Sequence, residues 1–275
     1  QLWEEVAQQV REKGGQVFMN TEVLEVLHIS DNEVQITVKD NISKEISTMI
    51  GNYFFSTMPV KELIASIKNP VPENVKNVAE NLVYRDFITV GLLLNKLQIK
   101  NKTDIPTLHN LVPDNWIYIQ ERDVKVGRLQ IFNNWSPYMV KDADKVWIGL
   151  EYFCNEGDEL WSMKDEDFKK FAIEELAKIS IIDKEDVLDS TLIRMPKTYP
   201  AYFGSYDRLN EIIDFFENFS NIFLIGRNGM HRYNNQDHSM LTAMTAVDNI
   251  TKGISSKKSI WQINTEDEYH ETTEK

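Results

Sequence analysis

The sequence predicts a mixed α+β (α/β) fold in which an antiparallel-sheet domain is inserted into a layered domain. Segments that alternate apolar and polar residues, as strands do, are interspersed with segments that have the apolar spacing of amphipathic helices. The end blocks, about 1–60 and 220–252, resemble parts of one layer system, whereas 61–219 holds antiparallel-looking strands rich in aromatic residues. Residues 253–275 are expected to form a C-terminal tail.

Composition restricts the classes of protein to which the chain can belong. Its 275 residues suffice for one large or two modest domains, and a hydrophobic content of 42% suffices for a core. The net charge of −13 argues against a nucleic-acid surface, because phosphate binding uses clustered Lys and Arg. One cysteine, Cys154, excludes an internal disulfide and fits a reducing compartment such as the cytoplasm. No window approaches the roughly 20 apolar residues of a membrane span.

The first block combines one helix with a strand meander. Leu2, Val6 and Val10 have helical spacing, and Gly14 and Gly15 follow as a stop signal. Alternation then predicts strands in "QVFMN", "EVLEVLHIS", "EVQITVKD" and "ISTMIGNYFFST". Asp and Asn between these segments supply the turns.

The middle block is predicted from the same two kinds of spacing. Short helices are expected in "VKELIASI" and "ENVKNVAENL", and strands in "YRDFITVGLLL", "NWIYIQ", "GRLQIFNNW" and "VWIGLEYF". An amphipathic helix in "DEDFKKFAIEELAKI" carries its apolar stripe at Phe168, Phe171, Ala172, Leu176 and Ile179. The strand "EDVLDSTLIRM" and the helix "DRLNEIIDFFENF" complete the block.

The end block is a buried strand, "NIFLI", a polar loop over 226–236 and a helix over 237–251. The apolar positions of this helix are Met240, Ala243, Met244, Val247 and Ile250. A helix N-terminus carries unpaired N–H groups and a partial positive charge, so it can hold an anion. Gly226 allows close approach to the backbone, and Arg227 adds a planar donor fork. The junction therefore suits a phosphorylated cofactor; the alternative is a polar surface loop before a capped helix.

The stretch "NIFLIGRNGMHRYNNQDHSMLTAMTAVDNI" resembles the C-terminal FAD-contacting segment of the flavin amine-oxidase and protoporphyrinogen-oxidase superfamily. Its Gly-Arg pair, with a Tyr six residues after the Arg, is most similar to the UDP-galactopyranose-mutase branch. "LWEEVAQQVREKGGQVFMNTEVLEV", "YFFSTMPVKELI" and "KTYPAYFGSYDRLNEI" resemble other stretches of the family in the same order. The resemblance implies a partial FAD-binding domain, a β-meander plus the C-terminal strand and helix, formed by 1–60 and 220–252. It implies a substrate domain over 61–219.

The chain departs from this family at one motif. The family opens with a G-x-G-x-x-G turn that cradles the pyrophosphate, and no such motif occurs here. We therefore expect a C-terminal portion of a flavoprotein. The full-length protein would bind FAD, and this chain by itself would hold none.

The resemblance also implies roles for individual residues. Val23 would place its backbone near the adenine, and Thr57 and Pro59 would lie near the adenosine and pyrophosphate. Gly226 and Arg227 would lie by the pyrophosphate and ribityl chain or the flavin edge. Gln236, Asp237 and Ser239 would offer N–H groups to the flavin.

Candidate substrate residues combine amides with aromatic hydroxyls, which suits sugars or planar molecules. They are Asn134, Tyr138, Tyr199 and Tyr233. The alternative is that most such aromatic residues are core residues. No spacing predicts a metal site. No catalytic residue is assigned, and a homo-oligomer stays possible through an apolar edge at 221–225.

Three functions remain open. The favoured one is an FAD-dependent oxidoreductase of the amine-oxidase type acting on a small molecule. The second is a UDP-galactopyranose-mutase-like enzyme of surface-polysaccharide synthesis, which needs a second cation beside Arg227 for a sugar diphosphate; Arg85, Arg128 and Arg194 are the candidates. The third is a non-catalytic, truncated binding module.

Overall fold

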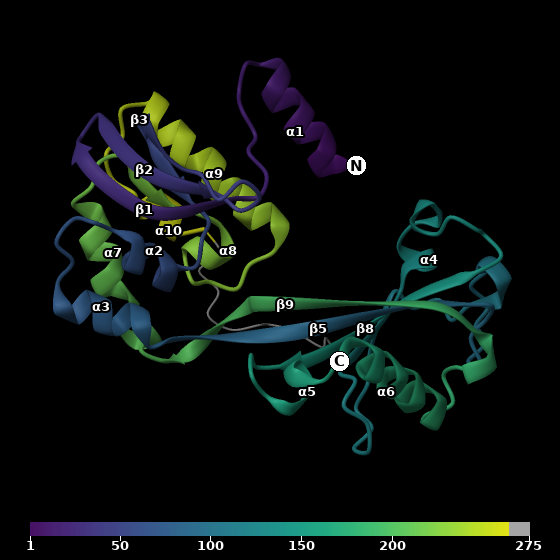
Figure 1. Cartoon of the computed structure of the whole chain (residues 1–275). Helices are drawn as coiled ribbons and strands as arrows, with labels where there is room; N and C mark the ends of the chain where they lie inside the picture. Colours follow the sequence, from purple (N-terminus) through teal and green to yellow (C-terminus); the bar gives the residue numbers. More distant parts are fainter. Residues whose placement is uncertain (264–275) are drawn as a thin grey trace. The chain divides into compact units, whose positions relative to one another are not determined.

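The computed structural model describes residues 1–263 and divides into two compact units (Figure 1). Unit 1 comprises Gln1–Val83 and the chain from Pro200 onward, and unit 2 comprises Tyr84–Tyr199. The inserted unit is thus shorter than the 61–219 expected from the sequence, because the helices on either side of it pack in the core of unit 1. The C-terminal tail predicted over 253–275 is described only to residue 263. Its first part is packed rather than free, since Lys257 and Ile260 are buried.

Unit 1 begins with helix α1 (Leu2–Glu12), followed by an antiparallel sheet of β1 (Thr21–Ser30), β2 (Glu33–Asp40) and β3 (Ile46–Gly51). The predicted helix and the meander up to residue 51 are therefore present. The strand expected over 46–57 is not continuous: it divides into β3 and β4 (Phe54–Ser56), and β4 pairs in a different sheet. The predicted strand over 16–20 is absent, because Asn20 adopts a left-handed φ of 57° and leads directly into β1. The apolar stripe of α1 is exposed, and no residue of that helix is buried.

The centre of unit 1 is a parallel pair of short strands, β4 (Phe54–Ser56) and β10 (Ile222–Leu224). Ile222 and Leu224 pack in a core that includes residues of α2 (Val60–Ser66), α3 (Glu73–Glu80) and α7 (Leu209–Glu217). Phe223, from the opposite face of β10, packs with residues of α9 (Gln236–Thr251) and α10 (Lys258–Trp261). The pair is thus the middle layer of a three-layer α/β arrangement. A short helix, α8 (Gly226–Gly229), begins the segment expected to be a loop.

Unit 2 is built on a five-stranded sheet in the order β6-β7-β8-β5-β9. The strands are β5 (Leu82–Leu94), β6 (Trp116–Tyr118), β7 (Arg128–Ile131), β8 (Val146–Cys154) and β9 (Val187–Gly204). It is separate from the β4–β10 sheet, as the sequence predicted, and β5 pairs with β8, β6 with β7 and β7 with β8 in antiparallel orientation. Helix α6 (Asp165–Lys178) covers one face through Phe168, Ala172 and Leu176, three residues of the predicted stripe.

Strand β7 of unit 2 is shorter than the sequence predicted, and several short helices follow or precede the strands. The segment 127–135 was expected to be one strand, but β7 ends at Ile131 and helix α4 (Phe132–Trp135) follows. The side chain of Asn133 causes this change of direction, donating to Lys145 O (2.8 Å) and accepting from Trp147 N (3.0 Å). Helix α5 spans Glu159–Ser162, and 3₁₀ turns occur at Leu108–Asn110, Pro137–Met139, Lys184–Asp186 and, in unit 1, Tyr206–Arg208.

Candidate cofactor site

The carboxyl ends of β4 and β10 lie side by side. Their parallel register pairs Leu224 with Ser56, and Ile225 N donates to Ser56 O at 3.0 Å. Thr57 therefore leaves one strand next to the point where Gly226 leaves the other. In open α/β sheets, ligands bind at this edge.

Gly226 is the point where three of the predicted cofactor residues meet. A Cβ atom built on it would lie 3.8 Å from Thr57 Cγ2 and 3.7 Å from Ser239 Oγ. Its φ of +71° belongs to the left-handed region that favours glycine. The N–H of Gly226 donates to Thr242 Oγ1 at 3.0 Å, which fixes the start of α8 against α9. Thr57, Gly226 and Ser239, far apart in sequence, thus form one small cluster.

Two buried polar atoms at this junction have no hydrogen-bond partner among the described residues: Ser56 Oγ and Asn228 Oδ1. Ser56 ends β4, and Asn228 lies in α8. Gly229 is also in direct contact with β4, since a Cβ atom there would lie 2.4 Å from Ser56 O. Buried polar atoms normally have partners, so these two suit a polar ligand at the strand ends. The sequence offered no signal for either residue.

Arg227 bonds across the loop to the residues that precede α9. Its Nε and Nη2 donate to Asn234 O at 3.0 Å and 2.6 Å, and its guanidinium lies 4.6 Å from the ring centroid of Tyr233. These two donors of the fork are used inside the protein. The phosphate role expected for Arg227, and the substrate role expected for Tyr233, stay predictions.

Helix α9 begins at this loop with a capping box. The Asn235 side chain accepts from the backbone N–H of His238, and His238 Nδ1 accepts from Asn235 N at 3.4 Å. Ser239 Oγ donates to Asn234 Oδ1 at 2.8 Å. Among the described residues, the N–H groups of Gln236 and Asp237 in the first turn have no acceptor. The helix start therefore keeps two donors directed out of the helix.

An aromatic brace joins the end of β9 to the same loop. The ring of Tyr202 stacks on Tyr206 with centroids 4.5 Å apart, and Tyr206 lies 6.0 Å from the ring of His231. Tyr202 Oη accepts from Tyr233 N at 2.8 Å, and His231 Nε2 lies 3.3 Å from Ala201 O. Burial lowers the pKa of His231 to about 4, so its ring is neutral near pH 7. The brace fixes the position of the loop 231–233.

In unit 2, a buried ion pair lies on the sheet face opposite α6. Arg128 Nη2 lies 2.5 Å from Glu151 Oε2 and donates to Tyr199 Oη at 2.5 Å. The guanidinium is 4.7 Å from the ring centroids of both Trp116 and Phe153. Trp116 and Phe153 remain partly exposed, so the face presents aromatic rings around a neutralised charge.

The other predicted substrate and cofactor residues are placed as follows. Asn134 Nδ2 donates to Val112 O and Asp114 O, which ties α4 to a neighbouring loop. Tyr138 is 95% exposed. Val23 pairs with Val38 beside a bulge in β1, and Pro59 is the residue before α2. The structure does not gather these four at one place within a unit, and their expected roles stay predictions.

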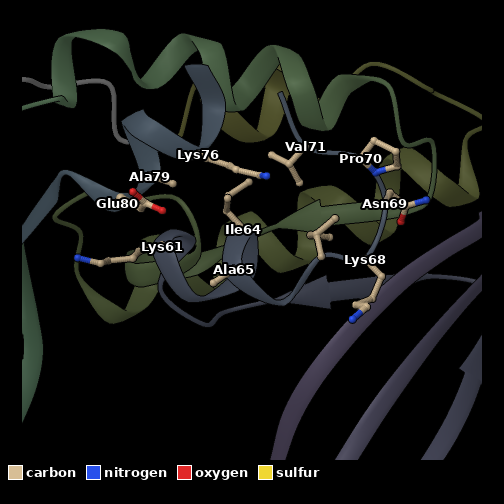
Figure 2. A pocket seen from close by; sticks show the side chains of 11 residues that line it. Lys61, Ile64, Ala65, Lys68, Asn69, Pro70, Val71, Lys76, Ala79 and Glu80 are labelled. Atoms are coloured by element: carbon tan, nitrogen blue, oxygen red, sulfur yellow. The ribbon is translucent and has the colours of Figure 1, made fainter. Parts of the chain in front are cut away.

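A pocket of about 430 Å³ lies elsewhere in unit 1, between α2 and α3 (Figure 2). Lys76 reaches across it, whereas Lys61 and Lys68 point to other sides. Lys68 forms an ion pair with Glu25 at 2.8 Å. None of the predicted cofactor residues lines this pocket. Across residues 1–263, no group of His, Cys, Asp and Glu suits a metal ion. In the same range, no helix is long and apolar enough to cross a membrane.

The chain was compared with protein families, curated proteins and solved structures, and only the solved structures match it. No protein-family model matches the chain, and no curated protein matches it significantly. A reduced UDP-galactopyranose mutase matches 95% of this chain with a TM-score of 0.72 at 18% identity. A putrescine oxidase with redesigned cofactor binding matches 90% with a TM-score of 0.59 at 14% identity. An oxidoreductase from Methanosarcina mazei matches 82% with a TM-score of 0.50 at 12% identity.

The chain spans about half the length of these structures: 52% of the mutase, 52% of the putrescine oxidase and 48% of the oxidoreductase. At these identities the likeness establishes the fold. It confirms the mixed α+β fold class and the structural resemblance to this group of enzymes that the sequence predicted.

Proposed function

We propose that this chain, which has the fold shared by these oxidases and mutases, is part of an FAD-dependent oxidoreductase of the amine-oxidase type. The observation that carries the proposal is the cluster of Thr57, Gly226 and Ser239 at the carboxyl ends of two parallel strands. The N-terminus of α9 adjoins it. The cluster lies at the edge where open α/β sheets bind ligands.

The residues present fit a flavin nucleotide. Gly226 keeps the strand exit free of a side chain, and the buried Ser56 Oγ and Asn228 Oδ1 are available for a polar group. The first-turn N–H groups of Gln236 and Asp237 would stabilise negative charge on the bound group. A bound flavin would supply two-electron chemistry. This chain's contribution would be to position the flavin and favour its anionic form.

We propose that unit 2 contacts the substrate. Its exposed aromatic face suits a planar or sugar-like small molecule, with Trp116 and Phe153 as stacking surfaces and Tyr199 as a hydroxyl. Tyr138, which is fully accessible, and Asn134 remain candidates on α4 and the turn after it. We assign no catalytic residue.

The alternative is a mutase-like enzyme acting on a nucleotide sugar, and the TM-score of 0.72 to a UDP-galactopyranose mutase favours it. A diphosphate needs cations whose donors are available. Arg128 is paired with Glu151, and Arg194 donates to Asp165 and to the carbonyls of Trp161 and Met163. Two of the three candidate cations are therefore already neutralised or engaged, which makes the oxidoreductase our first choice.

The proposal is tested by titrating the chain with FAD and following flavin fluorescence. A helix N-terminus and a few hydrogen bonds support a Kd on the order of 0.1–1 mM for this chain alone. Gly226→Val should weaken binding at least about tenfold, because the branched side chain fills the junction. Gly253→Val is the matched control: its φ of +69° is similar, but no atom lies within 4 Å of its Cβ position.

Equal losses from the two glycine substitutions would show that backbone strain, not the site, explains the effect. Binding that Gly226→Val leaves intact would place FAD elsewhere. Turnover of a UDP-sugar in the presence of dithionite-reduced FAD would favour the mutase alternative. FAD binding without turnover of amines or UDP-sugars would support the third function considered above, a non-catalytic binding module.

A further inference from the structure

The pocket between α2 and α3 is lined by a single stretch of unit 1, residues 61–80, and shares no residue with the candidate cofactor cluster (Figure 2). Its volume of about 430 Å³ lies in the range of pockets that hold small organic ligands. Three of its lining residues, Ile64, Ile67 and Ala79, are buried apolar residues of the unit 1 core. The pocket therefore offers an apolar surface that the proposed flavin does not use.

The loop that joins α2 to α3 is anchored to strand β1. The side chain of Asn69 bonds the backbone of His28 twice, accepting from its N–H at 2.8 Å and donating to its carbonyl oxygen at 2.9 Å. Lys68 N donates to Val26 O in the same strand at 2.9 Å. Pro70, which also lines the pocket, has a φ fixed by its ring. The wall of the pocket is thus preformed, which reduces the ordering cost of binding.

Lys76 places a positive charge over this apolar surface. Its side chain extends across the pocket in Figure 2, whereas the other two lining lysines, Lys61 and Lys68, point to other sides. Lys68 is already neutralised by Glu25 at 2.8 Å. Within residues 1–263, the ammonium group of Lys76 forms no hydrogen bond and no ion pair. The pocket therefore combines one available cation with an apolar lining.

These groups favour a carboxylate over a phosphate. Proteins usually hold phosphates with an Arg fork, with several cations or with a helix N-terminus. The lining contains no Arg, and it does not include Glu73, where α3 begins. Glu80, which does line the pocket, and the chain's net charge of −13 both repel a dianion. A single negative charge on an apolar body matches what remains.

We propose that the pocket between α2 and α3 binds a small monocarboxylate with an apolar body, of the class of medium-chain fatty acids. The carboxylate accepts a charge-assisted hydrogen bond from Lys76 Nζ, and the apolar body lies against Ile64, Ile67 and Ala79. This second site goes beyond the proposed flavin function and does not depend on it.

The test titrates the full chain with octanoate, in the absence of FAD, while methyl resonances are followed by nuclear magnetic resonance. We expect saturable shifts at Ile64, Ile67 and Ala79, with a Kd on the order of 1 mM. Lys76→Gln should weaken octanoate binding at least about fivefold, because the charge-assisted hydrogen bond is lost. Octanol, which has the same chain without the charge, should bind the wild type and Lys76→Gln equally.

The matched control is Lys61→Gln, which removes the same charge from a lining lysine that points away from the pocket. It should change octanoate binding by less than about twofold. Equal losses from the two substitutions overturn the proposal, because they would mean that surface charge in general attracts the anion. Octanol binding as tight as that of octanoate, or no saturable shifts within residues 61–80, also overturns it. FAD binding is measured separately, so failure here leaves the proposed function standing.

Discussion

The sheets of the two units are completed to different degrees. In unit 2, five strands and α6 enclose one continuous core that includes Ile88, Leu150 and Phe168, all fully buried. In unit 1, two three-residue strands lie between helices, and α9 keeps a large apolar stripe exposed. The sheet of unit 2 closes its own core. Within the described residues, the β4–β10 sheet of unit 1 leaves its strand edges unpaired and a face of α9 uncovered. Unit 2 should therefore unfold as a cooperative body of its own, and unit 1 should be the part that responds to ligands and partners.

The largest expected effect lies in unit 2. Arg128→Met removes the cationic partner of Glu151, whose side chain is 7% exposed. It leaves a buried carboxylate without a counter-charge, bonded only to Gln130 Nε2. We expect a loss of about 3–5 kcal/mol, confined to the transition of unit 2 in a calorimetric scan. The double variant Arg128→Met/Glu151→Leu should recover at least half of that loss. A shift of both transitions by the single variant would contradict the independence of the two units.

The next effect concerns the aromatic brace of unit 1 and its dependence on pH. The pKa of His231 is about 4 in the folded protein, below the ordinary value of 6.5, because the ring is buried. As pH falls below 6.5 the unfolded chain binds the proton first, so stability present above pH 6.5 is lost progressively down to about pH 4. The total loss is about 3 kcal/mol.

His231→Asn should flatten this dependence, because Asn does not titrate, and Asn tolerates the left-handed φ of 48°. Denaturant unfolding at pH 7, 5.5 and 4.5 measures the slope. His109→Asn is the control, because His109 has a similar φ of 52° but is exposed and lies in unit 2. An unchanged slope in His231→Asn would mean that another group titrates.

The smallest effect is at the start of α9. Asn235→Ala removes the capping side chain and should cost about 1 kcal/mol, with faster hydrogen exchange in the first turn of α9. Gln236→Ala, one residue later, removes a side chain that does not cap the helix and should change stability by less than about 0.5 kcal/mol. Equal effects of the two substitutions would show that the capping box does not stabilise the helix start.

The sequence predicted most elements because their spacing is local. The helix at 165–178 and the strands of the meander depend on neighbours three, four or two residues away. The position of α4 depends instead on Asn133 bonding to Lys145 and Trp147, which are distant enough in sequence that no spacing shows it. The exposed stripe of α9 was indistinguishable from a core stripe for the same reason: apolar spacing does not say which side of a helix is covered.

Some residues of the candidate site could likewise be predicted from the sequence, and others could not. Thr57, Gly226 and Ser239 were predicted by resemblance and do lie together. Ser56, Asn228, Asn234 and Thr242 were missed, because their importance comes from contacts between α8, α9 and the end of β4. The sequence also could not show that the donors of Arg128 are engaged by Glu151 and Tyr199.

The central claim, that the junction of β4, α8 and α9 holds a flavin nucleotide, is tested most directly by nuclear magnetic resonance. Backbone amide shifts of the labelled chain are followed while FAD is added to several times a Kd on the order of 0.1–1 mM. We predict that the shifts concentrate at Thr57, Gly226 and 236–239. Shifts concentrated around the pocket between α2 and α3, or no shifts at all, would contradict the claim.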